Sequence, residues 1–275
     1  MKVRWLAALA SFTFVYASAE ARELRVCADP NNMPFSNEAR QGFENRIVDI
    51  VARELKAQVT YVWWAQRRGN VRNTLQQGLC DVIPGVATDL EMLSTTQPYY
   101  RSAYVFVTRQ DRHLAIRSFD DERLPKLTVG VQMIGDDFAN TPPADALMRR
   151  GMVQNVRGYM VYGDYSKESP PRAIVEAVAN SNLDVAVVWG PLAGYFAQRS
   201  AVPLQVVTVA PLVDATLPMS FNISMGTRRE DAQLRGELNA ALERRRDEIH
   251  RVLHDYGVPL LEVTPKIQTS DRRTD

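Results

Sequence analysis

Along the first third of the chain, segments with the residue pattern of β-strands alternate with segments whose apolar positions have the spacing of a helix. A strand is expected at 24–29, and the β-branched and aromatic run at 58–64 predicts a second strand. From residue 45 onward, apolar positions recur three and four apart, which predicts a helix. A short helix is expected at 71–79 and a third strand at 81–83. This order of strands and helices predicts a parallel sheet covered by helices.

The same alternation begins again at residue 126, after a long apolar and aromatic strand at 99–108. An alternating strand at 220–225 and a long charged helix from 230 to 256 complete the pattern. Further strands are expected at 127–131, 153–162, 183–188 and 204–209, and further helices at 137–150 (interrupted near Pro142 and Pro143), 171–179 and 192–198.

Two similar α/β halves predict a two-lobed α/β protein in which each lobe is a central sheet covered by helices. We place residues 22–106 together with 220–263 in lobe 1 and residues 108–218 in lobe 2, so that the chain crosses between the lobes twice. In such a design a ligand binds in the cleft at the strand ends. Residues 264–275 form a polar C-terminal tail.

The N-terminus has the layout of a secretory signal peptide. Lys2 and Arg4 precede an apolar run at 5–16, and two small-x-small sites follow at 17–19 and 19–21. The apolar run is well short of the roughly 20 residues needed to span a bilayer, which argues against a membrane anchor. We therefore expect residues 1–19 to be removed and the mature protein to reside in the periplasm, without membrane insertion.

Composition excludes several classes of function. The 275 residues are 45% apolar and 24% charged, as in ordinary globular proteins. A net charge of +1 gives no global field for nucleic acid. Three His and two Cys leave little for a zinc or iron–sulfur site, and the His250/His254 pair is better explained as a solvated helix face. No nucleophile–base motif is present, so we expect neither a metal site nor an enzyme.

The two cysteines leave two alternatives open. In an exported chain, Cys27 in the first strand and Cys80 at the start of the third indicate one disulfide. The bond requires the two Cα atoms to come within roughly 4.4–6.8 Å. Two buried free thiols are the other alternative.

Several segments resemble periplasmic solute-binding proteins of the amino-acid type, family 3, which have the type II periplasmic binding protein fold. The similar segments are VCADPNNMPF at 26–35, GFE at 42–44, GLCDVI at 78–83, QPYY at 97–100 and VGVQ at 129–132.

Five longer segments are similar to a narrower group, the quinoprotein-dehydrogenase-associated (MxaJ/XoxJ) binding proteins. They are WWAQRRG at 63–69, VRNTL at 71–75, GDDFANTPP at 135–143, GYMVYGDY at 158–165 and VVWGPLAGY at 187–195. This resemblance implies an accessory protein of an exported methanol dehydrogenase that uses pyrroloquinoline quinone (PQQ), acting in its maturation or activation, with the apo form as partner. It implies no cofactor for this chain.

Four departures from the amino-acid binders remove the contacts that the resemblance would imply for a zwitterion. No Arg occurs in 88–94 to hold a carboxylate, and Gly190 stands where an Asp would hold the ammonium. Asn32 replaces an aromatic residue after the first strand. Asp136 and Asp137 occupy a helix N-terminus that would otherwise bind an anion. We therefore do not expect a standard amino acid as ligand.

An apolar cleft could instead receive a hydrophobic segment of a partner. For the tryptophans, packing in the lobe cores is an equal alternative, because strand residues alternate faces. Phe35 is expected to be a packing residue. The residues proposed for the cleft or the partner contact are Asp29, Asn32, Met33, Trp63, Trp64, Asp136, Asp137 and Trp189.

Two other functions compete with the accessory role. The first is the substrate-binding component of an ABC importer for a small solute that is not a standard amino acid. The second is an enzyme on this fold that uses carboxylates in the cleft, such as Asp29, Glu44, Asp136 and Asp137. Helix capping and turn formation explain Glu44 and Asp136 at least as well.

Overall fold

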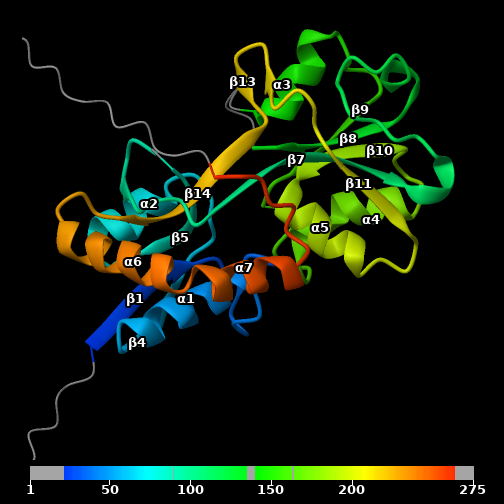
Figure 1. Cartoon of the computed structure of the whole chain (residues 1–275). Coiled ribbons are helices and arrows are strands. Elements are labelled where there is room, and N and C mark those ends of the chain that lie inside the picture. Colours follow the sequence, from blue (N-terminus) through cyan, green and yellow to red (C-terminus); the bar gives the residue numbers. More distant parts are fainter. Residues whose placement is uncertain (1–21, 89, 135–139, 163, 264–275) are drawn as a thin grey trace, which may run out of the picture.

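The computed structural model describes residues 22–88, 90–134, 140–162 and 164–263. The expected signal peptide, the C-terminal tail and the residues Asp136 and Asp137 lie outside this part of the chain. In Figure 1 the elements gather into two lobes, connected by two long strands. Within the described residues, no helix combines the length and apolar character that crossing a bilayer would require.

The two connecting strands are β7 (Tyr100–Arg109) and β14 (Ser220–Thr227), which pair antiparallel from Tyr100↔Ile223 to Ala103↔Ser220. They make one sheet continuous through both lobes, in the order β5-β14-β7-β10-β8-β9. Tyr100 and Ile223 pack in the core of lobe 1, whereas Val105 and Phe106 already pack in lobe 2. The crossing therefore begins a few residues before the expected boundary at 106.

Lobe 1 is built on the parallel pair β1 and β4, in the register Arg22↔Ala57 to Ala28↔Trp63. The helix α1 packs its buried side chains, spaced three and four apart from Phe43 to Val51, onto this pair. Its elements are β1 (Arg22–Ala28), β2 (Asn31–Asn32), β3 (Ser36–Asn37), α1 (Phe43–Glu54), β4 (Ala57–Trp63), α2 (Asn70–Asn73), β5 (Ile83–Ala87), β6 (Ser94–Thr95), α6 (Ala232–Arg244) and α7 (Arg246–Asp255).

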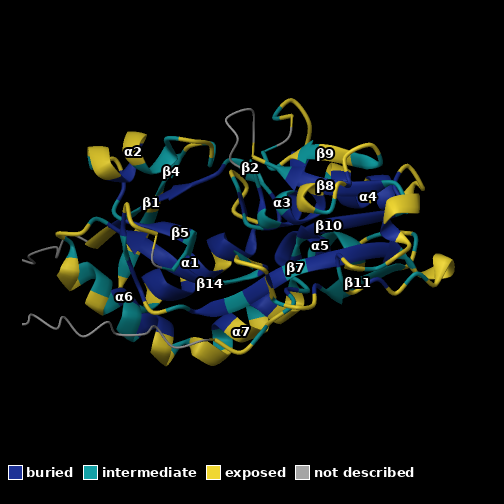
Figure 2. Cartoon of the chain, turned by 90° about the horizontal axis from the view of Figure 1, so that it is seen from above, coloured by how far each residue is buried: buried dark blue, intermediate teal, exposed yellow. Residues whose placement is uncertain are grey.

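In lobe 2, β8 pairs parallel with β9 and β10, and β7 lies between β10 and β11 in antiparallel pairings. Successive residues of β7 face opposite sides, so Phe106 packs in one apolar cluster and Val105 and Val107 in another. Figure 2 shows these central strands buried between helices. The elements are β8 (Val129–Met133), α3 (Pro142–Arg149), β9 (Val156–Met160), α4 (Ala173–Ala179), β10 (Val185–Trp189), α5 (Gly190–Gln198), β11 (Leu204–Thr208), β12 (Val213–Asp214) and β13 (Leu217–Pro218).

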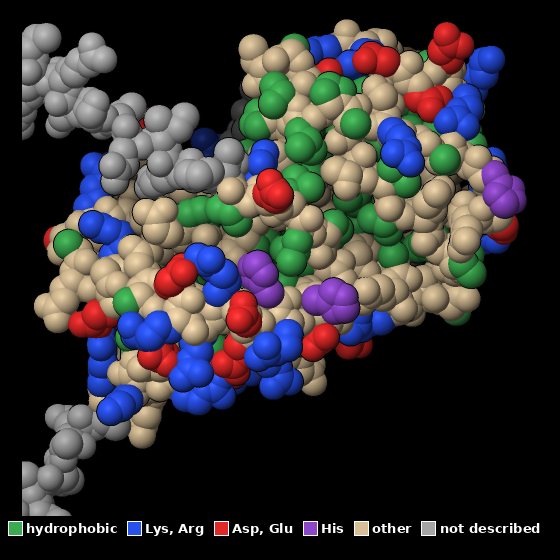
Figure 3. Space-filling view, in the orientation of Figure 1, with side chains coloured by type: hydrophobic (Ala, Val, Ile, Leu, Met, Phe, Trp, Pro, Cys, Tyr) green, Lys and Arg blue, Asp and Glu red, His purple; other side chains and the backbone are tan. Residues whose placement is uncertain are grey.

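Two helices differ from the sequence-based expectation. The prolines expected to interrupt a helix at 137–150 instead begin α3, because Pro142 stands at its first position and Thr141 accepts a hydrogen bond from the amide of Ala144. The long charged helix expected at 230–256 is broken at Arg245 into α6 and α7. Both α6 and α7 contact α1. Charged side chains gather over these two helices in Figure 3.

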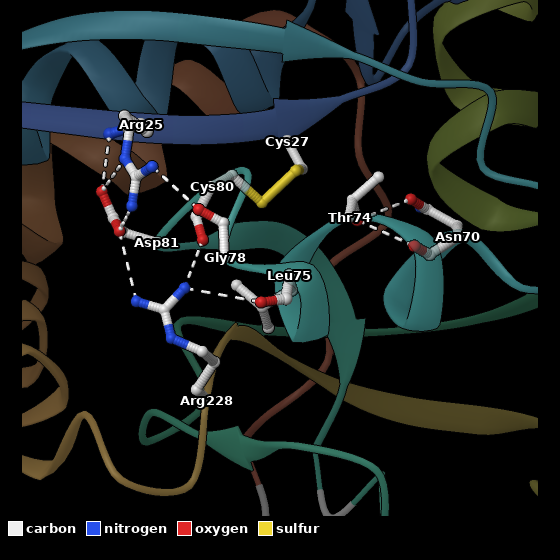
Figure 4. Close-up of a disulfide and its surroundings, with 9 residues drawn as sticks. All are labelled: Arg25, Cys27, Asn70, Thr74, Leu75, Gly78, Cys80, Asp81 and Arg228. Atoms are coloured by element: carbon white, nitrogen blue, oxygen red, sulfur yellow. Dashed lines mark hydrogen bonds and ion pairs between the residues drawn. A yellow bond between two sulfur atoms is a disulfide. The ribbon is translucent and has the colours of Figure 1, made fainter.

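A disulfide joins Cys27 of β1 to Cys80, with the Cα atoms 5.6 Å apart, and both sulfurs are buried (Figure 4). Beside it, Arg25 and Arg228 both bind the carboxylate of Asp81, at 2.6 and 3.3 Å. Burial opposes the ionisation of Asp81, but the hydrogen bonds from these arginines outweigh it and hold the pKa of Asp81 below its usual value. This cluster fixes the end of the segment that leads to β5.

The chain after α7 returns to the connecting strand β7. The hydroxyl of Ser102 donates to the carbonyl of Pro259 at 2.6 Å, and the amide of Leu261 donates to the carbonyl of Arg101 at 2.9 Å. A Cβ atom on Gly194 of α5 would lie 1.9 Å from the carbonyl oxygen of Gly257. The C-terminal segment of lobe 1 thus touches lobe 2 at a position where no side chain fits.

Candidate functional site

A cavity of about 340 Å³ lies where the two connecting strands meet the loops of both lobes. This volume falls at the lower end of the range usual for small-molecule sites, roughly 300–1,000 Å³. Both lobes contribute to its wall. The lining residues are Asn32, Phe35, Glu44, Gln66, Gly85, Ala87, Tyr104, Gln132, Val161, Trp189, Leu192, Phe221 and Ile223.

Three aromatic side chains from three adjacent strands form one side of the cavity. Trp189 at the end of β10 stands edge-on to Tyr104 of β7 and to Phe221 of β14, with ring centroids 5.3 and 5.9 Å apart. The amide of Trp189 donates to Oε1 of Gln132 at 2.9 Å, and Gln132 is itself buried. The sheet register Trp189↔Tyr104 therefore sets the position of the rings.

Among the described lining residues Glu44 is the acidic one, and its environment is unusual. The side chain is only 2% exposed, and its Oε2 has no hydrogen-bond partner. Burial, reinforced by the negative charge of Asp29, raises the pKa of Glu44 to about 8. A Cβ atom on Gly85 would lie 1.8 Å from Oε1 of Glu44, so the glycine makes room for the carboxyl group.

Helix capping does not account for Glu44. The N-cap of α1 is Gly42, and the side chain that binds it is that of Asn45, whose Oδ1 accepts the amides of Gly42 at 3.1 Å and Asn37 at 3.2 Å. The backbone amide of Glu44 donates to the carbonyl of Phe35 at 3.0 Å, which anchors the first turn to the loop after β1. The sequence-based explanation of this glutamate as a cap is therefore wrong.

The lobes touch each other beside the cavity, and Asp29 is at the centre of that contact. Its carboxylate accepts the amides of Asn31 at 2.8 Å and Gln66 at 2.7 Å, both in lobe 1, and the hydroxyl of Tyr165 in lobe 2. The side chain of Asn31 adds hydrogen bonds to the backbone of Lys167 and Ser169, at 2.8 and 3.0 Å. Asp29 thus stabilises the contact between the lobes, and both of its carboxylate oxygens already accept hydrogen bonds from the protein.

The residues proposed from the sequence end in different places. Asn32 and Trp189 line the cavity, whereas Asp29 is wholly buried in the contact just described. Met33 is buried and borders a second, more polar cavity. Trp63 stacks on Tyr61 with centroids 4.5 Å apart, and Trp64 is 41% exposed outside the cavity. Asp136 and Asp137 fall outside the described residues.

Sequence reasoning missed much of the wall, above all Tyr104, Phe221 and Gln132. Tyr104 and Phe221 were within predicted strands. Because these two strands cross between the lobes, their position could have indicated that both side chains border the cavity. Gln132 follows a predicted strand of lobe 2, where a ligand-facing side chain is expected. Nothing local to Glu44 marked it as buried, because Gly85 and Phe35 come from other segments.

The cavity lacks the usual partners of an α-amino acid. Of the described lining residues, Glu44 is the single charged one, and none is Arg or Lys. At Gly190, a Cβ atom would lie 2.5 Å from the carbonyl oxygen of Ala103 and 2.9 Å from Oγ of Ser102. An aspartate therefore does not fit there without a shift of the backbone.

No group of three or more metal-ligating side chains occurs in the described ranges. His250 and His254 lie on α7, and the side chain of His254 is 89% exposed beside Asp255.

Comparison with known proteins gives the family. The model for bacterial extracellular solute-binding proteins, family 3, matches residues 24–256. The chain belongs to this family. It is 33% identical to Protein MoxJ of Methylorubrum extorquens over 261 residues, 90% of this chain and 85% of that protein. It is 30% identical to Protein MoxJ of Paracoccus denitrificans over 262 residues, 89% of this chain and 91% of that protein.

Solved structures agree with that assignment. The periplasmic binding protein XoxJ from Methylobacterium extorquens AM1 superimposes with a TM-score of 0.71 at 38% identity, over 87% of this chain and 99% of XoxJ. MxaJ from Methlophaga aminisulfidivorans MPT gives a TM-score of 0.72 at 27% identity, over 86% of this chain and all of MxaJ. The expected type II periplasmic binding protein fold and the resemblance to the MxaJ/XoxJ group are thereby confirmed.

The buried carboxyl group makes a prediction about stability. Between pH 4.5 and 8, the unfolded chain ionises Glu44 while the folded protein keeps the proton, so the native protein loses stability as pH rises through this window. Glu44→Gln should therefore raise the free energy of unfolding by on the order of 2–3 kcal/mol at pH 7, and by little at pH 4. Urea denaturation across this pH range measures the difference between variant and wild type.

The exposed residue Glu122 supplies a control with the same chemical change. Glu122→Gln should leave the free energy of unfolding close to that of the wild type at every pH. A Glu44→Gln difference that does not grow with pH would mean that the native carboxyl group is already ionised at pH 7.

Proposed function

We propose that this protein is a periplasmic accessory of an exported PQQ-dependent methanol dehydrogenase and acts in its maturation or activation. The similarity to MoxJ, XoxJ and MxaJ over nearly nine-tenths of the chain is the observation that carries the proposal. The cavity supports it, because the groups that would hold an amino acid are missing from its described wall. The role is one of binding, without catalysis.

In this account the dehydrogenase is recognised before it is fully loaded. An apo form exposes apolar segments that the mature enzyme buries, and binding such a segment costs ordering entropy, so the complex is transient. Trp64 is the best placed of the proposed contact residues, since it is 41% exposed. Trp63 is held by its stacking on Tyr61, and Trp189 acts inside the cavity instead.

An importer component for a small solute is the competing function. It requires a transported ligand with high affinity in the cleft and has no consequence for the dehydrogenase. The two functions therefore differ in the deletion experiment described below, whereas the amino-acid titration tests import of a standard amino acid.

Free α-amino acids should not bind with the micromolar affinity that transport requires. The absence of a buried charged partner costs roughly 2–5 kcal/mol, which corresponds to about 30- to 4000-fold weaker binding. Calorimetric titration of the mature protein with the twenty standard amino acids tests this expectation. A single amino acid that binds with a micromolar Kd would restore the importer function.

Deleting the gene in its native host should lower the activity of the exported methanol dehydrogenase at least tenfold, with reduced PQQ or metal content of the isolated enzyme. Re-expression of the wild type should restore both. Trp64→Ala should restore them only in part, whereas Leu79→Ala, which also truncates an exposed apolar side chain in lobe 1, should restore them fully.

Normal PQQ content, metal content and activity in the deletion strain would refute the maturation role. Full rescue by Trp64→Ala would remove this residue from the contact and leave the partnership in place.

A further inference from the structure

The carboxyl group of Glu44 is a buried polar group with unused bonding capacity. Buried polar atoms are nearly always paired, because an unpaired one costs about 1–3 kcal/mol. Oε2 of Glu44 has no partner in the protein, and the residue borders a cavity of about 340 Å³. A bound molecule with a donor group would satisfy this atom.

The charges around the cavity favour a positive molecule. The carboxylate of Asp29 is the neighbouring charge that acts on Glu44, and the other titratable groups coupled to Glu44 are the phenols of Tyr61, Tyr99 and Tyr100. These groups are neutral or negative. Since no Lys or Arg occurs in the described wall, an anion finds no positive side chain there, whereas a cation is attracted by the ionised form of Glu44.

The aromatic content of the wall points the same way. Phe35, Tyr104, Trp189 and Phe221 all line the cavity. Aromatic rings attract ammonium and alkylammonium groups, and the gain reaches about 2 kcal/mol or more when the cation is desolvated. The amides of Asn32 and Gln66 add polar contacts at the same wall, which could bind a hydroxyl group of the ligand.

We propose that this cavity binds a small organic cation, an alkylammonium or methylated ammonium compound, with its positive charge against Glu44 and its carbon groups among the four rings. Such a site goes beyond the accessory role and does not depend on it. The volume suits a molecule of the size of choline.

Binding is linked to the ionisation of Glu44. At pH 7 a carboxyl group with a pKa of about 8 is mostly protonated, and the cation binds the ionised form. Each binding event at pH 7 should therefore release about 0.9 proton, and the affinity should rise about tenfold from pH 6 to pH 7 and level off above pH 8.

Isothermal titration calorimetry of the mature protein with choline, tetramethylammonium and n-butylammonium tests the proposal. The control ligand is 3,3-dimethylbutan-1-ol, which has the shape of choline without its charge. We expect saturable binding of at least one cation and at least tenfold weaker binding of the alcohol. Titrations in phosphate and in Tris should differ in enthalpy, because the two buffers take up the released proton with different heats.

Glu44→Gln should weaken cation binding at least tenfold and abolish the proton release, while Glu122→Gln should change neither. If Glu44→Gln does not fold, the pH series on the unmodified protein makes the same test. Absence of binding by all three cations up to 10 mM, equal binding of the alcohol, or unchanged binding by Glu44→Gln would each overturn the proposal. Because no dehydrogenase is present, these results are independent of the deletion experiment.

Discussion

The antiparallel pairing of β7 with β14 is the constraint on which the other features depend. This pairing makes one sheet continuous through both lobes. A change in the angle between the lobes must therefore twist the ribbon formed by β7 and β14, while its hydrogen bonds persist. The same pairing places Tyr104 and Phe221 beside Trp189 of the adjacent strand. The aromatic side of the cavity is therefore part of the hinge, and any molecule bound there contacts the element that joins the lobes.

The described part of the cavity wall combines these aromatic rings with one acidic residue, Glu44, and contains none of the basic residues typical of a carboxylate site. Of the described lining residues, Glu44 is the one that can carry a charge, and that charge is negative when the carboxyl group ionises. The proposed accessory role and the proposed cation site use different parts of the protein. Trp64 is exposed and does not line the cavity, whereas Glu44 is buried and lines it.

The elements were largely predictable from the sequence, because α1 and the strands carry strong periodic patterns. The helix break at Arg245 had no local signal, because neither Gly nor Pro stands near this position in the sequence. The site was predictable only in part. Asn32 and Trp189 follow predicted strands and line the cavity. Strand alternation could not decide whether Trp63 faces the cavity, and in the structure it stacks on Tyr61 instead. The burial of Glu44 depends on Gly85, about forty residues away, and required the structure.

The ionisation of Glu44 is the most direct test of the electrostatic account. In protein labelled with ¹³C at glutamate side chains, the carboxyl resonance of Glu44 is assigned by its absence from the Glu44→Gln spectrum and is followed from pH 4 to pH 10. The account predicts a midpoint near pH 8, because burial and the charge of Asp29 both disfavour the carboxylate. A midpoint near the ordinary value of about 4.5 would show that the group is ionised at neutral pH, which contradicts the account.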